Sequence, residues 1–438
     1  MKTTRLFFQP ACFSLAARVR LSSFSLAMSI LEALKGSALE IRDTPGGLAP
    51  RLATTARLAG TIARELSGLP LLAPWAARTA LARARAPPPG RISGPAVALA
   101  RDVRYGPGPR QLADVWVPPG WSDAASGAPG PGATTCGPSG PVALLVHGGV
   151  WSSGDKWTLG PAAAALAAAS GAAVAVPNYS LWPAAEGSGG GEGLDAGAVD
   201  VTAALGWALA GGVAGAVGGA AASTPCPSSP RVTLVGHSAG AHLAALAALA
   251  WSAADGSDDK KNRSPHPPSS SPAAVVSLAG VFDLAAHYEY ERGRGVHYLS
   301  TMARAAGGAV GWDGREEGKE GASTPAAPTP RQAAGMEACS PTAILEGRAA
   351  RWAPTARPGL GRCLAARPAR LPAAWLLIAG GADGTVPASQ SAAFAGALRG
   401  AGIQGVRCEV VPGVGHVDFV TGWGGEWAEA VATVVRGD

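Results

Sequence analysis

From residue 101 to the C-terminus, short apolar runs alternate with alanine-rich stretches, and this alternation constrains the fold more than any other feature of the chain. Short apolar runs separated by helical stretches are typical of parallel strands joined by crossover helices. We predict strands at 142–146, 172–176, 232–235, 274–278, 375–378 and 406–411, and helices at 161–169, 196–210, 239–250 and 389–401. The sequence therefore predicts an α/β fold with a mostly parallel central sheet flanked by helices.

The composition supports a folded body of enzyme size. Hydrophobic residues make up 47% of the 438 residues and charged residues 15%, a balance that excludes a chain disordered throughout. The 61 glycines and 37 prolines concentrate between the predicted elements. We expect surface insertions at 122–140, 187–193, 211–230, 256–272 and 314–331.

The positive charge of the chain is confined to its N-terminal part. The formal net charge is +6, but residues 1–100 hold 13 Lys and Arg against four Asp and Glu. The body from 101 to 438 is slightly acidic, so we predict no nucleic-acid partner. The six cysteines form no CxxC pair and the histidines form no HExxH motif, so we predict neither a disulfide framework, a bound metal nor an organic cofactor.

Residues 1–100 form a leader whose destination stays open. No acidic residue precedes Glu32, and arginines alternate there with serines and apolar residues. This pattern is typical of a chloroplast or mitochondrial transit peptide; a secretory signal or anchor and an unprocessed leader are the alternatives. The uncharged apolar runs at 6–17, 21–31 and 66–77 are shorter than a spanning helix requires. Apolar residues at helical spacing over 52–66 indicate a helix that lies on a membrane surface or packs on the body.

The predicted strand at 232–235 leads directly into the sequence GHSAG at 236–240 and then into an alanine- and leucine-rich helix. This strand–turn–helix context is that of a nucleophile elbow, in which a sharp turn exposes a serine hydroxyl. Glycines at 236 and 240 leave room where strand and helix crowd. We predict that Ser238 is a nucleophile.

A serine hydroxyl needs a base to take its proton and an acid to orient that base. Asp383 follows the predicted strand 375–378, and His416 follows the last predicted strand. Because the carboxyl ends of parallel strands lie at one sheet edge, we expect both side chains near Ser238. Asp418 and Asp200 are weaker candidates for the acid, since one lies two residues from His416 and the other in a predicted helix.

The sequence HGGVW at 147–151 follows the first predicted strand of the body. Glycines there let backbone N–H groups approach a tetrahedral intermediate, and the N–H after the nucleophile is a further donor. We predict an oxyanion hole from Gly148, Gly149 and Ala239, with His147 ordering the loop. Trp151 either walls the acyl pocket or packs the core. We treat the two histidines that flank the elbow, His237 and His242, as structural.

These motifs resemble the α/β-hydrolases with an HGGxW loop, a group that includes arylformamidases, small carboxylesterases and isoprenylcysteine methylesterases. The order serine, acid, histidine is that of the α/β-hydrolases. Three segments are similar to the methylesterases: the paired runs at 101–106 and 110–118, the segment 174–183, and LAGVFDL at 278–284 with its continuation to 302. A further short match is the pair at 340–341. The chain departs from the pattern at Ala279 and Phe282.

The resemblance implies an α/β-hydrolase fold over 101–438 with a small cap at about 282–335. It implies hydrolysis of the methyl ester of a prenylated C-terminal cysteine, on a free prenylcysteine or a protein terminus. It also implies residence at the endoplasmic reticulum or Golgi membrane, contacted through the leader. Arylformamidase or short-chain carboxylesterase activity is the alternative, and a non-catalytic ligand receptor is the alternative from another class. We expect substrate contacts at Trp151, Phe282, Arg292 and Met302.

Overall fold

A computed structural model describes residues 97–119, 121, 140–182, 194–217, 230–254, 271–294, 296–297, 301–307, 328, 330–349 and 370–438, together with residues 47–49, 52, 55 and 56. The predicted leader runs and most of the predicted insertions therefore lie outside the described residues. The predicted helix at 52–66 also lies outside the described residues, apart from residues 52, 55 and 56.

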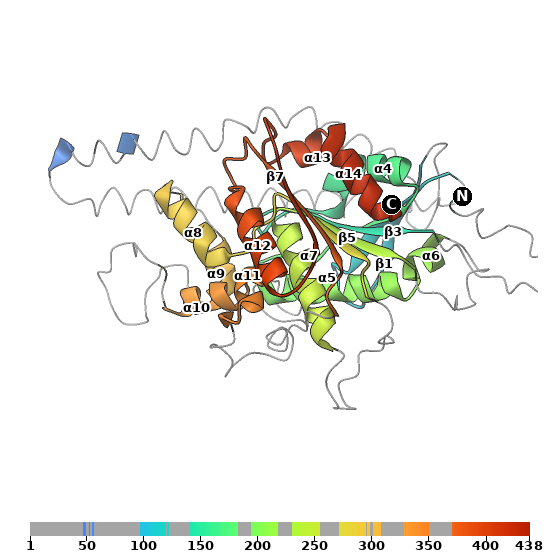
Figure 1. The fold of residues 1–438 in the computed structure, drawn as a ribbon, viewed down its shortest axis with the longest axis horizontal. Helices are drawn as coiled ribbons and strands as arrows, with labels where there is room; N and C mark the ends of the chain where they lie inside the picture. Colours follow the sequence, from blue (N-terminus) through green and yellow to red (C-terminus); the bar gives the residue numbers. More distant parts are fainter. Residues whose placement is uncertain are drawn as a thin grey trace, which may run out of the picture.

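An eight-stranded sheet forms the centre of the molecule, in the order β1-β2-β4-β3-β5-β6-β7-β8 (Figure 1). β1 pairs antiparallel with β2 and β2 with β4, whereas all pairings from β4 to β8 are parallel. The strands are β1 (Ala98–Arg104), β2 (Leu112–Val117), β3 (Val142–Val146), β4 (Ala173–Pro177), β5 (Val232–His237), β6 (Ala274–Leu278), β7 (Ala374–Gly380) and β8 (Gly405–Val411). The prediction of a mostly parallel sheet flanked by helices is confirmed.

Helices cover both faces of the sheet, because side chains alternate between the two faces of each strand. On β3, Leu144 and Val146 join one apolar core, whereas Ala143 and Leu145 join the other. The first core is closed by α5 (Leu194–Leu209), α7 (Ala239–Ala254) and α12 (Ser389–Gly400). The second is closed by α4 (Gly160–Ser170), α13 (Asp418–Thr421) and α14 (Gly425–Arg436), which lie along the opposite side of the sheet in Figure 1.

Four helices form a cap beside the sheet, at the end of the molecule away from β1 (Figure 1). They are α8 (Leu284–Gly293), α9 (Met302–Gly307), α10 (Pro330–Ala338) and α11 (Pro341–Leu345). The cap thus extends past the expected end at residue 335. The reason lies in its packing: α10 lies against α9 and α8, and α11 continues from it onto α12.

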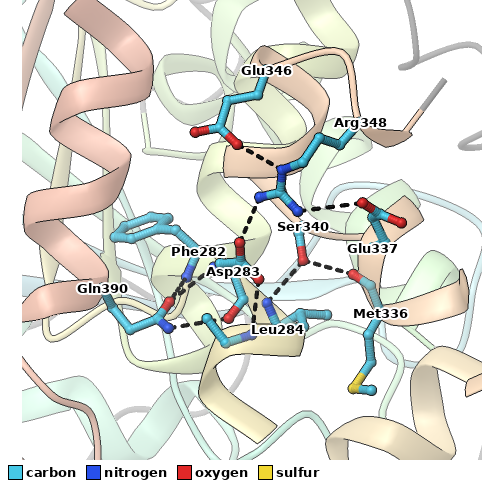
Figure 2. A network of polar contacts seen from close by, with 10 residues as sticks. Phe282, Asp283, Leu284, Met336, Glu337, Ser340, Glu346, Arg348 and Gln390 are labelled. Atoms are coloured by element: carbon cyan, nitrogen blue, oxygen red, sulfur yellow. Dashed lines mark hydrogen bonds and ion pairs between the residues drawn. The ribbon is translucent and has the colours of Figure 1, made fainter. Parts of the chain in front are cut away.

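Polar contacts fasten the start of the cap to its end and to α12, as Figure 2 shows. The Gln390 side chain accepts hydrogen bonds from the N–H groups of Phe282 and Asp283 at 2.8 and 2.9 Å. Arg348 donates to the Asp283 carboxylate at 2.6 Å, and the Ser340 hydroxyl accepts from the N–H of Leu284 at 2.8 Å. The segment that leaves β6 is therefore held on both sides.

The element boundaries differ from the prediction in two informative places. A short helix, α6 (Gly212–Val217), occupies the first part of the expected insertion at 211–230, because Val213 and Val217 are apolar and bury against the core. β1 begins at Ala98, before the expected domain boundary at residue 101. It contributes the buried Ala100 to the core.

Candidate active site

Ser238 stands at the turn between β5 and α7, with a backbone conformation that side chains rarely adopt. Its φ is 54°, in the left-handed region. The turn is tight enough that a methyl group on Gly240 would lie 2.3 Å from the Val146 carbonyl oxygen, and one on Gly236 would lie 2.5 Å from the Ala241 Cα. Glycine is therefore required at both places, and the elbow holds Ser238 at the carboxyl end of the sheet.

The structure brings the three predicted triad residues into one hydrogen-bonded chain. The Ser238 Oγ lies 3.0 Å from His416 Nε2, and His416 Nδ1 lies 2.8 Å from the Asp383 carboxylate. Asp383 follows β7 and His416 follows β8, so neighbouring parallel strands deliver the acid and the base to one edge. The two weaker acid candidates have other partners: Asp418 accepts from the N–H of Gly415, and Asp200 binds the residues described below.

Asp383 is held as a carboxylate. Burial raises its pKa, but the hydrogen bond from His416 and those from the N–H groups of Thr385 and Val386 outweigh burial and leave the pKa below its ordinary value. The two N–H donors both bind Oδ1, at 2.8 and 2.9 Å, and Oδ2 accepts from His416. The geometry thus places the His416 proton on Nδ1 and leaves the Nε2 lone pair for Ser238.

The glycines of HGGVW bring backbone close to the nucleophile. A methyl group on Gly148 would lie 3.0 Å from the Ser238 Cβ, and Gly149 has a φ of 121°, where a side chain would strain the backbone. Within the described residues, no backbone carbonyl accepts from the N–H of Gly148 or Gly149. Ala239 is the first residue of α7, where the helix leaves its N–H without a partner. Gly148 and Ala239 therefore lie beside Ser238, and Gly149 follows Gly148 in the same loop.

Contacts from three distant segments hold the loop after these glycines. The Val150 carbonyl accepts from the Thr301 hydroxyl at 2.6 Å, and the Trp151 carbonyl accepts from the Trp182 N–H at 2.8 Å. The Trp151 indole N–H donates to His242 Nδ1 at 3.1 Å. Trp151 is almost completely buried. Of the two alternatives for this residue, the structure favours packing in the core over lining an open acyl pocket.

Buried polar residues beneath the loop were missed by the sequence reasoning. Lys156 is completely buried and forms ion pairs with Asp114 and, at 2.8 Å, with Asp102. Arg110 donates to the Tyr179 carbonyl at 2.7 Å and to the Gly154 carbonyl at 3.2 Å. The segments 101–118 and 174–183 were noted for resemblance alone. No local pattern indicates that their polar side chains support the oxyanion loop.

Asp200 illustrates a second supporting role that the sequence left open. Its carboxylate accepts from the Ser180 N–H and hydroxyl, both at 2.7 Å, and from the Gln111 side chain at 2.7 Å. These contacts tie α5 to the segment after β4 and to the hairpin β1–β2. Asp200 therefore organises the body at a distance from His416, and it is not the acid of the triad chain.

Three buried histidines surround the triad, and each is neutral at physiological pH. Burial lowers the pKa of His147 to about 4, of His237 to about 3 and of His242 to about 4. His147 stacks on Tyr179 and contacts the Gly148 carbonyl at 2.8 Å, which supports its predicted role in ordering the loop. His237 Nε2 donates to the His416 carbonyl at 2.9 Å, so it steadies the loop that carries the base.

These depressed pKa values predict acid sensitivity of the fold. An imidazole in an unfolded chain titrates near 6.5, so the unfolded state takes up protons first as the pH falls. The contribution of these histidines to the free energy of unfolding is then fully present above about pH 6.5. It declines as the pH falls toward 4, by about 4 kcal/mol per pH unit for three such groups. Thermal unfolding at pH 7.5, 6.0 and 5.0 should show a steep drop in Tm. His242→Gln should make the dependence shallower, and a Tm constant from pH 7.5 to 5.0 would contradict the argument.

The predicted substrate contacts on the cap take positions different from those expected. Phe282 is completely buried and stacks on Phe394, with ring centroids 4.1 Å apart, so it is a core residue and not part of an accessible substrate surface. Met302 is also buried in the core. Arg292 pairs with Glu289 on α8 at 2.5 Å. Phe282 and Met302 thus lie in the core, whereas Arg292 stays partly exposed on α8.

No group of three or more His, Cys, Asp and Glu side chains is placed to hold a metal ion within the described ranges. No helix in this part of the chain is long and apolar enough to cross a membrane.

Comparisons with known proteins agree with the fold. The profile described as the alpha/beta hydrolase family matches residues 143–432, more than half of the chain. A solved structure of esterase B from Lactobacillus rhamnosis, inhibited by a C6–C4 SN3 compound, is similar with a TM-score of 0.53 and 18% identity over 86% of this chain and 94% of the other. Esterase B from the same organism is similar in a second structure with a TM-score of 0.50 and 19% identity over 86% and 95%. No curated protein matches the sequence. The chain belongs to the alpha/beta hydrolase family.

Proposed function

We propose that this protein is a serine carboxylesterase that hydrolyses the methyl ester of a prenylated C-terminal cysteine. The observation that carries the esterase activity is the hydrogen-bonded chain Ser238–His416–Asp383 beside Gly148, whose N–H has no backbone acceptor within the described residues. Nucleophile, base, orienting acid and oxyanion donors are the groups that acyl transfer requires. The two similar structures are esterases by name, which agrees with this class.

The residues present account for each step of the reaction. Ser238 Oγ attacks the ester carbonyl carbon while His416 Nε2 takes the hydroxyl proton. The oxygen of the tetrahedral intermediate receives hydrogen bonds from the N–H groups of Gly148, Gly149 and Ala239. His416 then returns its proton to the departing methanol, which leaves an ester on Ser238. Water attacks that ester while His416 Nε2 takes one of its protons. His416 then returns this proton to Ser238 Oγ as the bond between Oγ and the acyl carbon breaks, and the prenylcysteine acid leaves and ionises in solution.

Two exposed valines support an apolar substrate. Val150 follows Gly149 and is 48% exposed, and Val417 follows His416 and is 41% exposed. Large aliphatic side chains at such exposure are the exception among the described residues, and these two are adjacent in sequence to the predicted oxyanion donor and base. Exposed apolar side chains next to these two residues in sequence favour a substrate with a hydrocarbon part, such as a prenyl chain.

The substrate is tested by mass spectrometry of the carboxylic acid formed from N-acetyl-S-farnesylcysteine methyl ester. Parallel reactions contain N-acetylcysteine methyl ester, which lacks only the prenyl chain, p-nitrophenyl acetate and N-formylkynurenine. We expect Ser238-dependent turnover with a preference for the prenylated ester. Turnover of another substrate with the prenyl ester untouched would overturn the methylesterase proposal and favour a general esterase or arylformamidase. Ligand binding with no turnover of any substrate would favour the receptor alternative.

The proposed substrate is bound to membranes, so the proposed site of action is the surface of the endoplasmic reticulum or Golgi, with residues 1–100 as the segment that contacts it. A fluorescent fusion at the C-terminus should co-localise with an endomembrane marker. Accumulation in the chloroplast or mitochondrion would contradict this location and support the transit-peptide interpretation of the leader.

A further inference from the structure

The loop after Gly149 contains two consecutive strained backbone positions. Val150 and Trp151 have φ values of 46° and 62°, two consecutive residues other than glycine in the left-handed region. Each such residue costs on the order of 1–3 kcal/mol and persists where surrounding contacts impose it. The Gly149 carbonyl is bound by the N–H groups of Ser152 and Ser153, at 3.1 and 2.9 Å. The strained residues 150–151 directly follow Gly149, whose N–H is a predicted oxyanion donor, and their conformation depends on the contacts that surround them.

One buried side chain links this loop to two other elements. His242 lies on α7, one helical turn after Ser238, and is completely buried. Its Nδ1 accepts from the Trp151 indole N–H at 3.1 Å, and its Nε2 donates to the Cys339 carbonyl at 2.8 Å, between α10 and α11 of the cap. The Trp151 indole meets the imidazole edge to face, with centroids 5.3 Å apart.

These two contacts require one protonation state of the ring. Nδ1 must keep a lone pair to accept from the indole, and Nε2 must carry the proton that the carbonyl receives. Burial holds the pKa of His242 near 4, so the ring is neutral and keeps this tautomer over the physiological range. A second cap contact, from the Thr301 hydroxyl to the Val150 carbonyl, reaches the adjoining peptide.

We propose that His242 is a positioning residue that makes the oxyanion hole depend on the seated cap. It connects Trp151 of the loop to Cys339 of the cap through a single imidazole, and Thr301 adds a parallel connection. Substrate binding beneath the cap then acts on the same contacts that orient the Gly149 N–H. This inference rests on the proposed esterase activity, because it concerns transition-state stabilisation by the loop.

The test compares purified full-length variants with p-nitrophenyl acetate as the probe ester. His242→Phe keeps a buried ring but removes both hydrogen bonds, and we expect kcat to fall about 10- to 100-fold with KM changed less than about threefold, since a misplaced oxyanion donor affects the transition state alone. Affinity for an aliphatic trifluoromethyl ketone, whose adduct with Ser238 carries an oxyanion, should fall by a similar factor. His242→Gln, which retains a donor and an acceptor, should restore most of kcat.

Two milder variants test the same connection where His242→Phe fails to fold. Trp151→Phe removes only the indole N–H, and Thr301→Val removes only the hydroxyl, whereas Thr301→Ser keeps it. We expect about a 5- to 20-fold loss of kcat for the first two and none for Thr301→Ser. The double variant Trp151→Phe/His242→Phe should lose little more kcat than His242→Phe alone. The hydrogen bond that Trp151→Phe removes is already absent in His242→Phe.

Leu249→Ala is the matched control, because it destabilises the same helix at a buried position farther from the elbow. It should lower Tm and leave kcat unchanged. Equal kcat in wild type and in His242→Phe, Trp151→Phe and Thr301→Val would overturn the inference while leaving the esterase proposal intact. A loss of kcat in Leu249→Ala as large as in His242→Phe would overturn it too, since general destabilisation then explains the effect. A wild-type protein with no activity on any ester would overturn both proposals.

Discussion

Ser238→Ala is expected to lower kcat by about six orders of magnitude with little change in KM. The side-chain oxygen is the atom that attacks, so its removal leaves water as the only nucleophile, and rate losses of about 10⁶-fold are typical of such a change. Because only one oxygen atom is lost, the pocket and the oxyanion donors keep their places, and substrate still binds. Steady-state kinetics with an activated ester measure both constants.

A serine on the helix that follows Ser238 serves as the control. Ser252 is buried on α7, and its hydroxyl donates to the Leu249 carbonyl at 2.7 Å. Ser252→Ala removes a buried hydroxyl from that helix and should keep kcat within about twofold. A serine-directed fluorophosphonate should label wild type and Ser252→Ala, but not Ser238→Ala. More than about 1% of wild-type kcat in Ser238→Ala would exclude Ser238 as the nucleophile.

Asp383→Asn is expected to lower kcat about 10⁴-fold without unfolding the protein. The amide oxygen must accept the two N–H bonds from Thr385 and Val386, because those donors converge on a single oxygen of Asp383. The amide NH₂ then faces His416 Nδ1, which is forced to accept. The His416 proton moves to Nε2, and the ring can no longer take the proton of Ser238.

Asp418→Asn is the control for this prediction, because Asp418 is the other acid near the base. Its carboxylate accepts from the N–H of Gly415 at 2.7 Å, and an amide oxygen can accept the same bond. We expect kcat within about threefold of wild type and a similar Tm. A loss of kcat larger for Asp418→Asn than for Asp383→Asn would reverse the assignment of the acid.

Most of the sheet was predictable because buried parallel strands leave a strong local signal. The runs 142–146 and 274–278 were placed at their observed ends, since both are apolar on both faces and bounded by breaks in the pattern. The antiparallel edge was expected only through resemblance. The outer strand β1 is mostly half-buried, and a register shift interrupts it between Ala100 and Val103, so periodicity is weak there.

Ser238, Asp383 and His416 were predictable for a related reason. Each follows a strand of the parallel sheet, and in such a sheet all carboxyl ends meet at one edge whatever the sequence between them. The order of the residues along the chain and their places after strands were therefore enough to predict that the three would meet. Ser238 and His416 meet although 178 positions of sequence separate them. The glycines beside them are visible in the sequence as motifs, but the clashes they avoid are only partly local: a methyl group on Gly236 would meet Ala241 in the same turn, whereas one on Gly240 would meet the Val146 carbonyl of β3.

The sequence by itself thus determined the sheet, the elbow and the three residues at its edge, since these depend on local patterns and on the geometry of parallel strands. The tertiary structure alone decided which side chains face the site and which fill the core. Phe282 was expected at the substrate and stacks in the core, whereas Thr301 and His242 hold the oxyanion loop without any local sign. Their contacts join residues 91 to 151 positions apart, and contacts at such separation depend on how packed elements meet and not on neighbouring residues.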